Sequence, residues 1–235
     1  MCGPSPFAAL LLRSGARSRH RLLLTGRACS RPFSVAVPHL LPLLVRGINN
    51  LSDARYCAGM GADKLTFVLD PGLPGFLDTK TVKELAGWVA GVELIGEFDQ
   101  LSAYEINAIS TECQLDAVLL RTPRTAEELA EIAPPVYLEL PATHEALAQA
   151  LPDALAGVVV ELPENVAEAT LASLSRLGNR QPLWVGPGLR PELALHLARK
   201  LTLAGLVLPS GHEVQPGLRD FDQLEAVFEA LETDD

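Results

Sequence analysis

From residue 42 onward the chain alternates short apolar runs with longer amphipathic runs, and the pattern repeats roughly every 22 to 28 residues. Short apolar runs predict buried strands, and a 3.6-residue apolar period predicts helices. The predicted strands are 43–46, 64–69, 93–98, 117–121, 136–140, 157–161, 183–185 and 205–208. The predicted helices are 51–60, 79–89, 102–111, 125–132, 143–150, 166–177, 191–200 and 222–231. Two helix starts, Ser102-Ala-Tyr-Glu105 and Thr125-Ala-Glu-Glu128, have the pattern of a capping box.

Eight successive strand–helix units predict the α/β class and, within it, the closed (β/α)8 or TIM barrel as a single domain. The length of 235 residues suits one such domain. The chain is 48% hydrophobic but only 5% aromatic, so its core must consist mainly of aliphatic residues, which suits parallel strands under helices. An open doubly wound sheet is the alternative. The first strand is followed by Arg46-Gly-Ile-Asn-Asn50, which lacks the triple-glycine turn of dinucleotide-binding sheets.

The first 40 residues differ in charge from the remainder. They hold six Arg and no acidic residue, so we expect a leader at 1–41 that is disordered and a barrel domain at 42–235. The leader resembles an organelle transit peptide in composition, although translation from an upstream start codon would also produce such a segment. The predicted location is the cytoplasm, or an organelle after removal of the leader. The apolar runs of the leader, Phe7–Leu12 and Leu22–Leu24, are too short to cross a membrane, so no membrane association is expected.

The remainder of the chain is acidic. It contains 13 of the 19 basic residues and all 29 acidic ones, a net charge of −16, which argues against nucleic acid as a partner. The four cysteines, at positions 2, 29, 57 and 113, have neither the spacing of a zinc site nor that of a disulfide framework. We therefore expect no metal and no cofactor.

Two glycine turns follow the last two predicted strands. One contains Gly186 and Gly188. The other contains Ser210 and Gly211 and lies in the stretch 205–220, which predicts a buried strand that runs into a small glycine-punctuated loop. Amides freed by such turns can bind a phosphate, and this fold often holds phosphate after its seventh and eighth strands. We expect a phosphate site there, with simple turn geometry as the alternative.

Charged residues stand at the ends of several other predicted strands. Arg46 and Arg121 either bind an anionic substrate or pair with Glu97, Glu139 and Glu161 as a structural network in the barrel mouth. Both alternatives remain open from the sequence.

A series of ordered motifs extends over residues 43–231. They are Val45-Arg-Gly-Ile48, Asp53-Ala54, Gly61-Ala-Asp63 with Phe67-Val68, Ile95-Gly-Glu-Phe98, Leu115-Asp-Ala-Val118, Gly186-Pro-Gly-Leu189 and Ser210-Gly211 with Pro216-Gly217 and Asp220. Together these motifs resemble the phosphoribosylanthranilate isomerase family of tryptophan biosynthesis. The resemblance implies an Amadori-type isomerisation of a phosphoribosyl aminated sugar. It also implies a small phosphorylated sugar as the partner of a monomer or homodimer.

The resemblance also shows where the chain departs from the family. Arg46 stands at the position of the catalytic cysteine base, and Arg cannot take up a proton. Glu161 stands at the position of the aspartate that acts as general acid, so it is the candidate acid. The alternative to an isomerase is an inactive or repurposed relative that binds a phosphate ligand or serves as an interaction protein.

Overall fold

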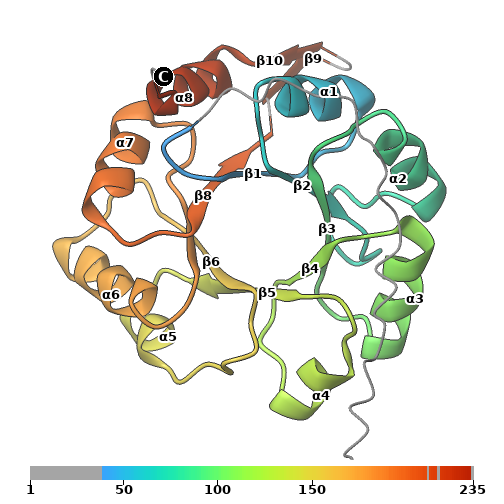
Figure 1. The fold of residues 1–235 in the computed structure, drawn as a ribbon, viewed down its shortest axis with the longest axis horizontal. Coiled ribbons are helices and arrows are strands. Elements are labelled where there is room, and N and C mark those ends of the chain that lie inside the picture. Colours follow the sequence, from blue (N-terminus) through green and yellow to red (C-terminus); the bar gives the residue numbers. More distant parts are fainter. Residues whose placement is uncertain (1–38, 211, 216–217, 234–235) are drawn as a thin grey trace, which may run out of the picture. The chain divides into compact units, whose positions relative to one another are not determined.

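The computed structural model describes residues 39–210, 212–215 and 218–233. In it, eight parallel strands form a closed barrel in chain order (Figure 1). The strands are β1 (Leu43–Arg46), β2 (Lys64–Val68), β3 (Glu93–Phe98), β4 (Ala117–Leu120), β5 (Val136–Pro141), β6 (Gly157–Glu161), β7 (Leu183–Gly186) and β8 (Gly205–Pro209). Because β1 pairs with β8, with Leu43 opposite Leu206, the sheet has no edges. The predicted (β/α)8 barrel is confirmed, and the open-sheet alternative is wrong.

A helix follows each strand and lies outside the barrel (Figure 1). The helices are α1 (Leu51–Gly59), α2 (Thr79–Ala86), α3 (Ala103–Cys113), α4 (Ala126–Glu131), α5 (His144–Ala148), α6 (Glu168–Gly178), α7 (Pro191–Lys200) and α8 (Asp222–Leu231). Both predicted capping boxes form, with Ser102 and Thr125 as N-caps. Most predicted ends are within two residues of the observed ones. The largest difference is α2, which ends at Ala86, three residues before the predicted end.

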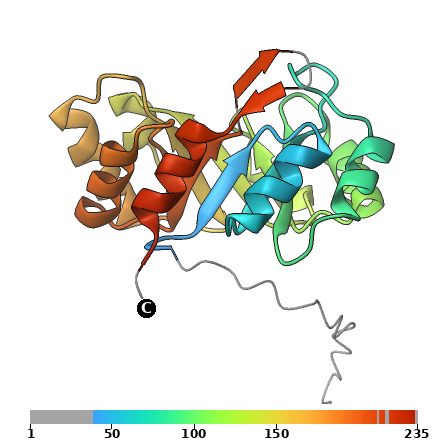
Figure 2. The same cartoon turned by 90° about the horizontal axis from the view of Figure 1, so that it is seen from above.

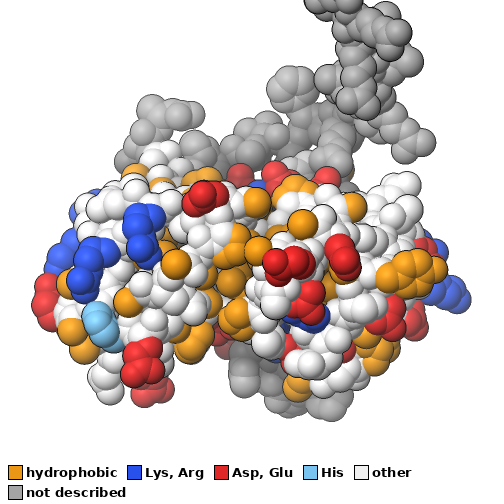
Figure 3. Space-filling model, turned by 90° about the horizontal axis from the view of Figure 1, so that it is seen from below, with side chains coloured by type: hydrophobic (Ala, Val, Ile, Leu, Met, Phe, Trp, Pro, Cys, Tyr) orange, Lys and Arg blue, Asp and Glu red, His pale blue; other side chains and the backbone are white. Residues whose placement is uncertain are grey.

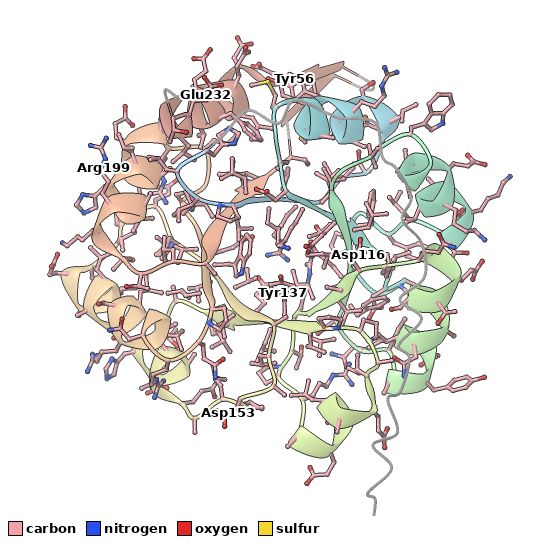
Figure 4. The ribbon with its side chains drawn as sticks, in the orientation of Figure 1. Tyr56, Asp116, Tyr137, Asp153, Arg199 and Glu232 are labelled. Carbon is pink, nitrogen blue, oxygen red and sulfur yellow. The ribbon has the colours of Figure 1, made fainter. Side chains whose placement is uncertain are left out.

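The strands separate two apolar layers because successive side chains point to opposite faces of a sheet. Outward side chains such as Val45 pack under the helices. Inward side chains fill the barrel interior, and Tyr137 lies among them in the middle of the ring of strands (Figure 4). The buried inward cluster is Leu44, Ile95, Ala117, Leu119, Tyr137, Val159, Trp184 and Val207. Below the mouth, therefore, the barrel is a packed core.

Two glycines make this interior packing possible. A Cβ on Gly205 would lie 2.2 Å from Cζ3 of Trp184 and 2.5 Å from the carbonyl oxygen of Pro42. A Cβ on Gly157 would lie 2.9 Å from the same indole and 3.0 Å from Tyr137. The two large aromatic side chains therefore occupy space that small residues on β6 and β8 leave open.

After β8 the chain forms a hairpin, where the sequence predicted only a glycine-punctuated loop. Strands β9 (His212–Gln215) and β10 (Leu218–Asp220) pair antiparallel, with a register irregularity between Leu218 and Arg219. Figure 2 shows the hairpin beyond the end of β8, outside the ring of parallel strands. The prediction of a loop through 212–220 was therefore wrong for these strands, which are only four and three residues long and too short to show a clear strand period.

The predicted leader at 1–41 lies almost entirely outside the described residues and stays a prediction. Of its last residues, Leu40 donates its amide to the carbonyl oxygen of Leu231 on α8. None of the helices in the described part of the chain has the length and apolarity that a membrane crossing requires.

Candidate functional site

The charged side chains of the barrel mouth converge because each follows an inward-facing apolar residue by two positions. Arg46 follows Leu44 on β1, and Glu97 follows Ile95 on β3. Arg121 follows Leu119 of β4 in the same way. Glu139 and Glu161 continue the pattern on β5 and β6, after Tyr137 and Val159. A period of two places all five side chains on the inner face, at the carboxyl ends of parallel strands.

Glu97 is the centre of this charged cluster and is fully buried. Its Oε2 accepts from Arg46 Nη2 at 2.7 Å and from Nη2 and Nε of Arg121 at 2.7 and 3.0 Å. Its Oε1 accepts from Arg46 Nε at 3.1 Å and from the hydroxyl of Thr66 on β2. Both oxygens of this buried carboxylate are thus hydrogen-bonded, as a buried charge requires.

Arg46 extends the network to the other side of the mouth. Its Nη2 donates to Oε2 of Glu139 at 2.9 Å, and its Nη1 donates to Oε1 of Glu161 at 2.7 Å. The Arg46 guanidinium is therefore held by three carboxylates while its residue is only 8% exposed. Of the two alternatives for Arg46 and Arg121, the structure contains the ion-pair network. A substrate-binding role for either residue stays a prediction.

The network keeps its central groups ionised. Burial by itself would raise the pKa of Glu97, but the hydrogen bonds and charge of Arg46, the bond from Thr66 and the charge of Arg121 lower it to about 2. Burial would lower the pKa of Arg46, but the hydrogen bonds and charges of Glu97 and Glu139 raise it above its already high ordinary value. Neither group can exchange a proton near neutral pH.

A cavity of about 260 Å³ opens over part of this network. It is lined by Arg121, Glu139, Leu140, Pro141 and Glu161. The Arg121 side chain is 31% exposed and that of Glu161 57%, compared with 9% for the side chain of Arg46. Among the described residues, Arg121 Nη1 has no hydrogen-bond partner, so this nitrogen can still bind a ligand that enters the cavity.

The predicted phosphate turns have partners of their own. Gly186 lies against β6, where a Cβ would be 3.2 Å from Cγ of Glu161, and Gly188 has a left-handed φ of +65°. The amide of Ser210 donates to the carbonyl oxygen of Arg46 at 2.9 Å, and its hydroxyl donates to that of Gly47 at 3.2 Å. Gly211 lies outside the described residues. Phosphate binding by these four residues stays a prediction, as does the absence of a metal or cofactor.

The structure adds organising residues that sequence reasoning did not single out. The hydroxyl of Thr66 joins Glu97 to the amide of Gly47, which donates to it at 3.1 Å. Arg190 donates to the carbonyl oxygens of Pro187, Glu164 and Pro163 and so connects the loops after β6 and β7. Neither residue carries a motif, and each acts through partners that are distant in the sequence.

Asp70, which the sequence places at the end of the second strand, also organises loops. It is 3% exposed and accepts from the amides of Gly72, Asp99 and Gln100 at 2.8 to 2.9 Å. Burial would raise its pKa, but these amides outweigh that effect and lower it. The carboxylate therefore joins the loops after β2 and β3 and stays charged.

Comparison with known proteins supports the resemblance seen in the motifs. No protein-family model matches the chain. A curated N-(5'-phosphoribosyl)anthranilate isomerase from Syntrophus aciditrophicus is 24% identical over 194 residues, which cover 79% of this chain and 84% of that protein.

Solved structures give the same result for the fold. Monomers of the dimeric phosphoribosylanthranilate isomerase from Thermotoga maritima match with a TM-score of 0.69 at 21% identity, covering 81% of this chain and 97% of theirs. A phosphoribosyl anthranilate isomerase in complex with reduced 1-(o-carboxyphenylamino)-1-deoxyribulose 5-phosphate matches with a TM-score of 0.68 at 20% identity and the same coverage. The predicted resemblance to this isomerase family is confirmed, and so is its barrel fold.

Proposed function

We propose that this chain is a phosphoribosylanthranilate isomerase-like protein that binds a small phosphorylated sugar at its barrel mouth and does not itself carry out the Amadori rearrangement. The main support for the proposal is the burial and ion pairing of Arg46. At the strand position where the family has its base, a buried guanidinium forms ion pairs with three carboxylates. We take the class of ligand from the similar proteins, because one of them is bound to a carboxyphenylamino deoxyribulose phosphate.

The rearrangement needs a general acid and a general base on either side of the sugar. Arg46 cannot serve as the base, and Glu97, with a pKa of about 2, is too weak a base and already accepts hydrogen bonds at both oxygens. Glu161, the candidate acid, accepts a hydrogen bond from Arg46, and a proton on that oxygen would displace this bond. The proton-transfer machinery is therefore incomplete.

Binding is supported by groups that remain accessible. Arg121 lines the cavity, and its Nη1 has no hydrogen-bond partner in the part of the chain that the structure describes. A guanidinium nitrogen of this kind suits a carboxylate or phosphate oxygen. On the other side of the mouth, α7 begins directly after the Gly186–Gly188 turn, and its N-cap Arg190 makes no side-chain cap bond. The amides of this first turn are the natural place for the sugar phosphate. Arg46 acts as a positioning residue, since it orients the carboxylates around the cavity.

A second candidate is isomerisation by a different pair of groups. Glu139 and Glu161 line the same cavity, and their side chains are 25% and 57% exposed. In this alternative Glu161 acts as the acid and Glu139 as the base. Two carboxylates can in principle divide these roles when their surroundings differ.

Complementation separates the two candidates. A tryptophan auxotroph that lacks the isomerase would receive the unmodified chain, the Arg46→Cys variant or a Lys83→Met control, which changes only an exposed pair with Glu112. We expect no growth from the unmodified chain. Growth from the unmodified chain would contradict the non-catalytic proposal, and loss of that growth in a Glu139→Gln variant would favour the second candidate.

Calorimetry tests the binding. We expect saturable binding of ribose 5-phosphate and of the reduced deoxyribulose phosphate analogue. Gly188→Asp and Gly188→Asn form a matched pair, because both side chains tolerate a left-handed φ but only Asp adds a negative charge. At the mouth site, the Asp variant should lose most of the affinity and the Asn variant should retain much of it. Equal affinities would place the phosphate elsewhere.

A further inference from the structure

A second polar cavity, of about 360 Å³, lies outside the barrel between α5 and α6. Its polar lining consists of His144 from α5 and of Ser173, Arg176, Asn179 and Arg180 from α6 and the turn that follows it. None of these residues belongs to the barrel mouth. Figure 3 shows one face of the molecule, with Lys and Arg side chains gathered near a His on the side where α5 and α6 lie.

Ser173 is the buried polar residue that lines this cavity. It is 3% exposed, and its hydroxyl donates to the carbonyl oxygen of Ala169 at 3.0 Å. Its oxygen is therefore an acceptor for Nη2 of Arg176 at 3.3 Å and for Nδ1 of His144 at 3.1 Å. One buried hydroxyl thus holds the imidazole and a guanidinium next to each other.

The charge of this cavity is not balanced within the described part of the chain. There, no carboxylate lies within ion-pair distance of Arg176 or Arg180, whereas Arg46, Arg121 and Arg124 all pair with glutamates. The two guanidinium groups contact only polar or carbonyl partners: Arg176 Nε reaches the carbonyl oxygen of Ala172 at 3.3 Å, and Arg180 Nη2 reaches that of Gln149 at 3.5 Å. Two unneutralised cations in a chain of net charge −10 form a local positive site.

We infer that this cavity is a second anion-binding site, which takes a phosphate group either as free phosphate or as the head of a small phosphate ester. Guanidinium groups match phosphate oxygens in pairs, and the amide of Asn179 and the imidazole of His144 add donors. The volume is that of a small-molecule site. The site is independent of the barrel mouth, so the proposed function does not depend on it.

The test uses the full chain carrying Gly188→Asp, which removes phosphate binding at the mouth. Calorimetric titration with inorganic phosphate and separately with ribose 5-phosphate should each show one saturable site. Tighter binding of one of the two identifies whether free phosphate or an ester is preferred. Adding Arg176→Gln and Arg180→Gln should weaken binding at least about 10-fold, because two charge-assisted hydrogen-bond donors are lost.

The matched control is Arg55→Gln with Arg199→Gln, which removes the same charge from α1 and α7. It should leave phosphate affinity within about two-fold, since charges outside the cavity are screened by salt. If the double variant at 176 and 180 fails to fold, His144→Ala replaces it, because His144 is exposed. The inference is overturned if the Gly188→Asp chain shows no saturable phosphate binding, if the cavity variants bind as well as their parent, or if the control loses as much affinity.

Discussion

The buried charge network should make Arg46 a residue on which the stability of the barrel depends. Arg46→Met keeps a long side chain and removes the charge. Fully buried Glu97 then loses two of its hydrogen bonds and keeps those from Arg121 and Thr66. Removing one partner of a buried ion pair generally costs about 3–5 kcal/mol, because the other charge is left without full compensation. We expect a loss of this size in the free energy of unfolding at pH 7.

The lowered pKa of Glu97 is consistent with a loss of this size. The network lowers that pKa from its ordinary 4.5 to about 2, a difference worth about 3 kcal/mol. Because the folded pKa lies below the unfolded one, this stability is present above pH 4.5 and is lost as the pH falls toward 2. Without Arg46, burial dominates and the pKa of Glu97 rises. The variant should therefore lose less stability than the unmodified chain over this acid range.

Urea unfolding followed by circular dichroism, at pH 7 and at steps down to pH 3, measures both effects. A double-mutant cycle with Glu97→Gln isolates the pair, and the double variant should be more stable than the sum of the two single losses predicts. Lys83→Met is the control, since the side chains of Lys83 and Glu112 are each about half exposed and such pairs contribute about 1 kcal/mol or less.

Two results would contradict this prediction. One is a loss of stability in Arg46→Met that is no larger than the loss in Lys83→Met, and the other is a cycle that shows no coupling between positions 46 and 97. Either result would mean that the ion pairs in the mouth do not contribute to stability, and that Arg46 is not constrained by its three carboxylates.

Three further predictions concern the packing and the loops. Gly205→Ala should destabilise the barrel by about 2 kcal/mol or more in urea unfolding, since its Cβ would overlap Trp184, whereas Gly59→Ala, with nothing within 4 Å, should be neutral or slightly stabilising. Asp70→Asn should cost about 1–3 kcal/mol at pH 7. Because the pKa of Asp70 is lowered in the fold, its contribution disappears as the pH falls below 3.8, so an equal loss at low pH would contradict the assignment. Arg190→Gln should speed hydrogen exchange of the amides in 162–167, and unchanged exchange would show that its carbonyl contacts do not hold that loop.

Much of the fold can be predicted from the sequence, because each strand and helix has a local period. The strand ends, and with them the residues of the mouth, follow from the same pattern. The hairpin of β9 and β10 could not be predicted in this way, since it is short and interrupts the strand–helix alternation. The role of Asp70 was also missed, because its three amide partners lie in two loops that only the folded chain brings together.

The eight strand–helix units, the place of Arg46 in the barrel mouth and the departure from the family at that residue can all be predicted from local patterns in the amino-acid sequence. These patterns leave two alternatives for Arg46 and Arg121, and the folded barrel shows that both residues pair with glutamates. The partners of Arg46 are 51, 93 and 115 residues away along the chain. Closure of the barrel brings their carboxylate oxygens within 3.1 Å of the Arg46 guanidinium nitrogens, and no local sequence pattern encodes that distance. The strand period determines which way a side chain points, whereas the closed sheet determines which side chains it meets.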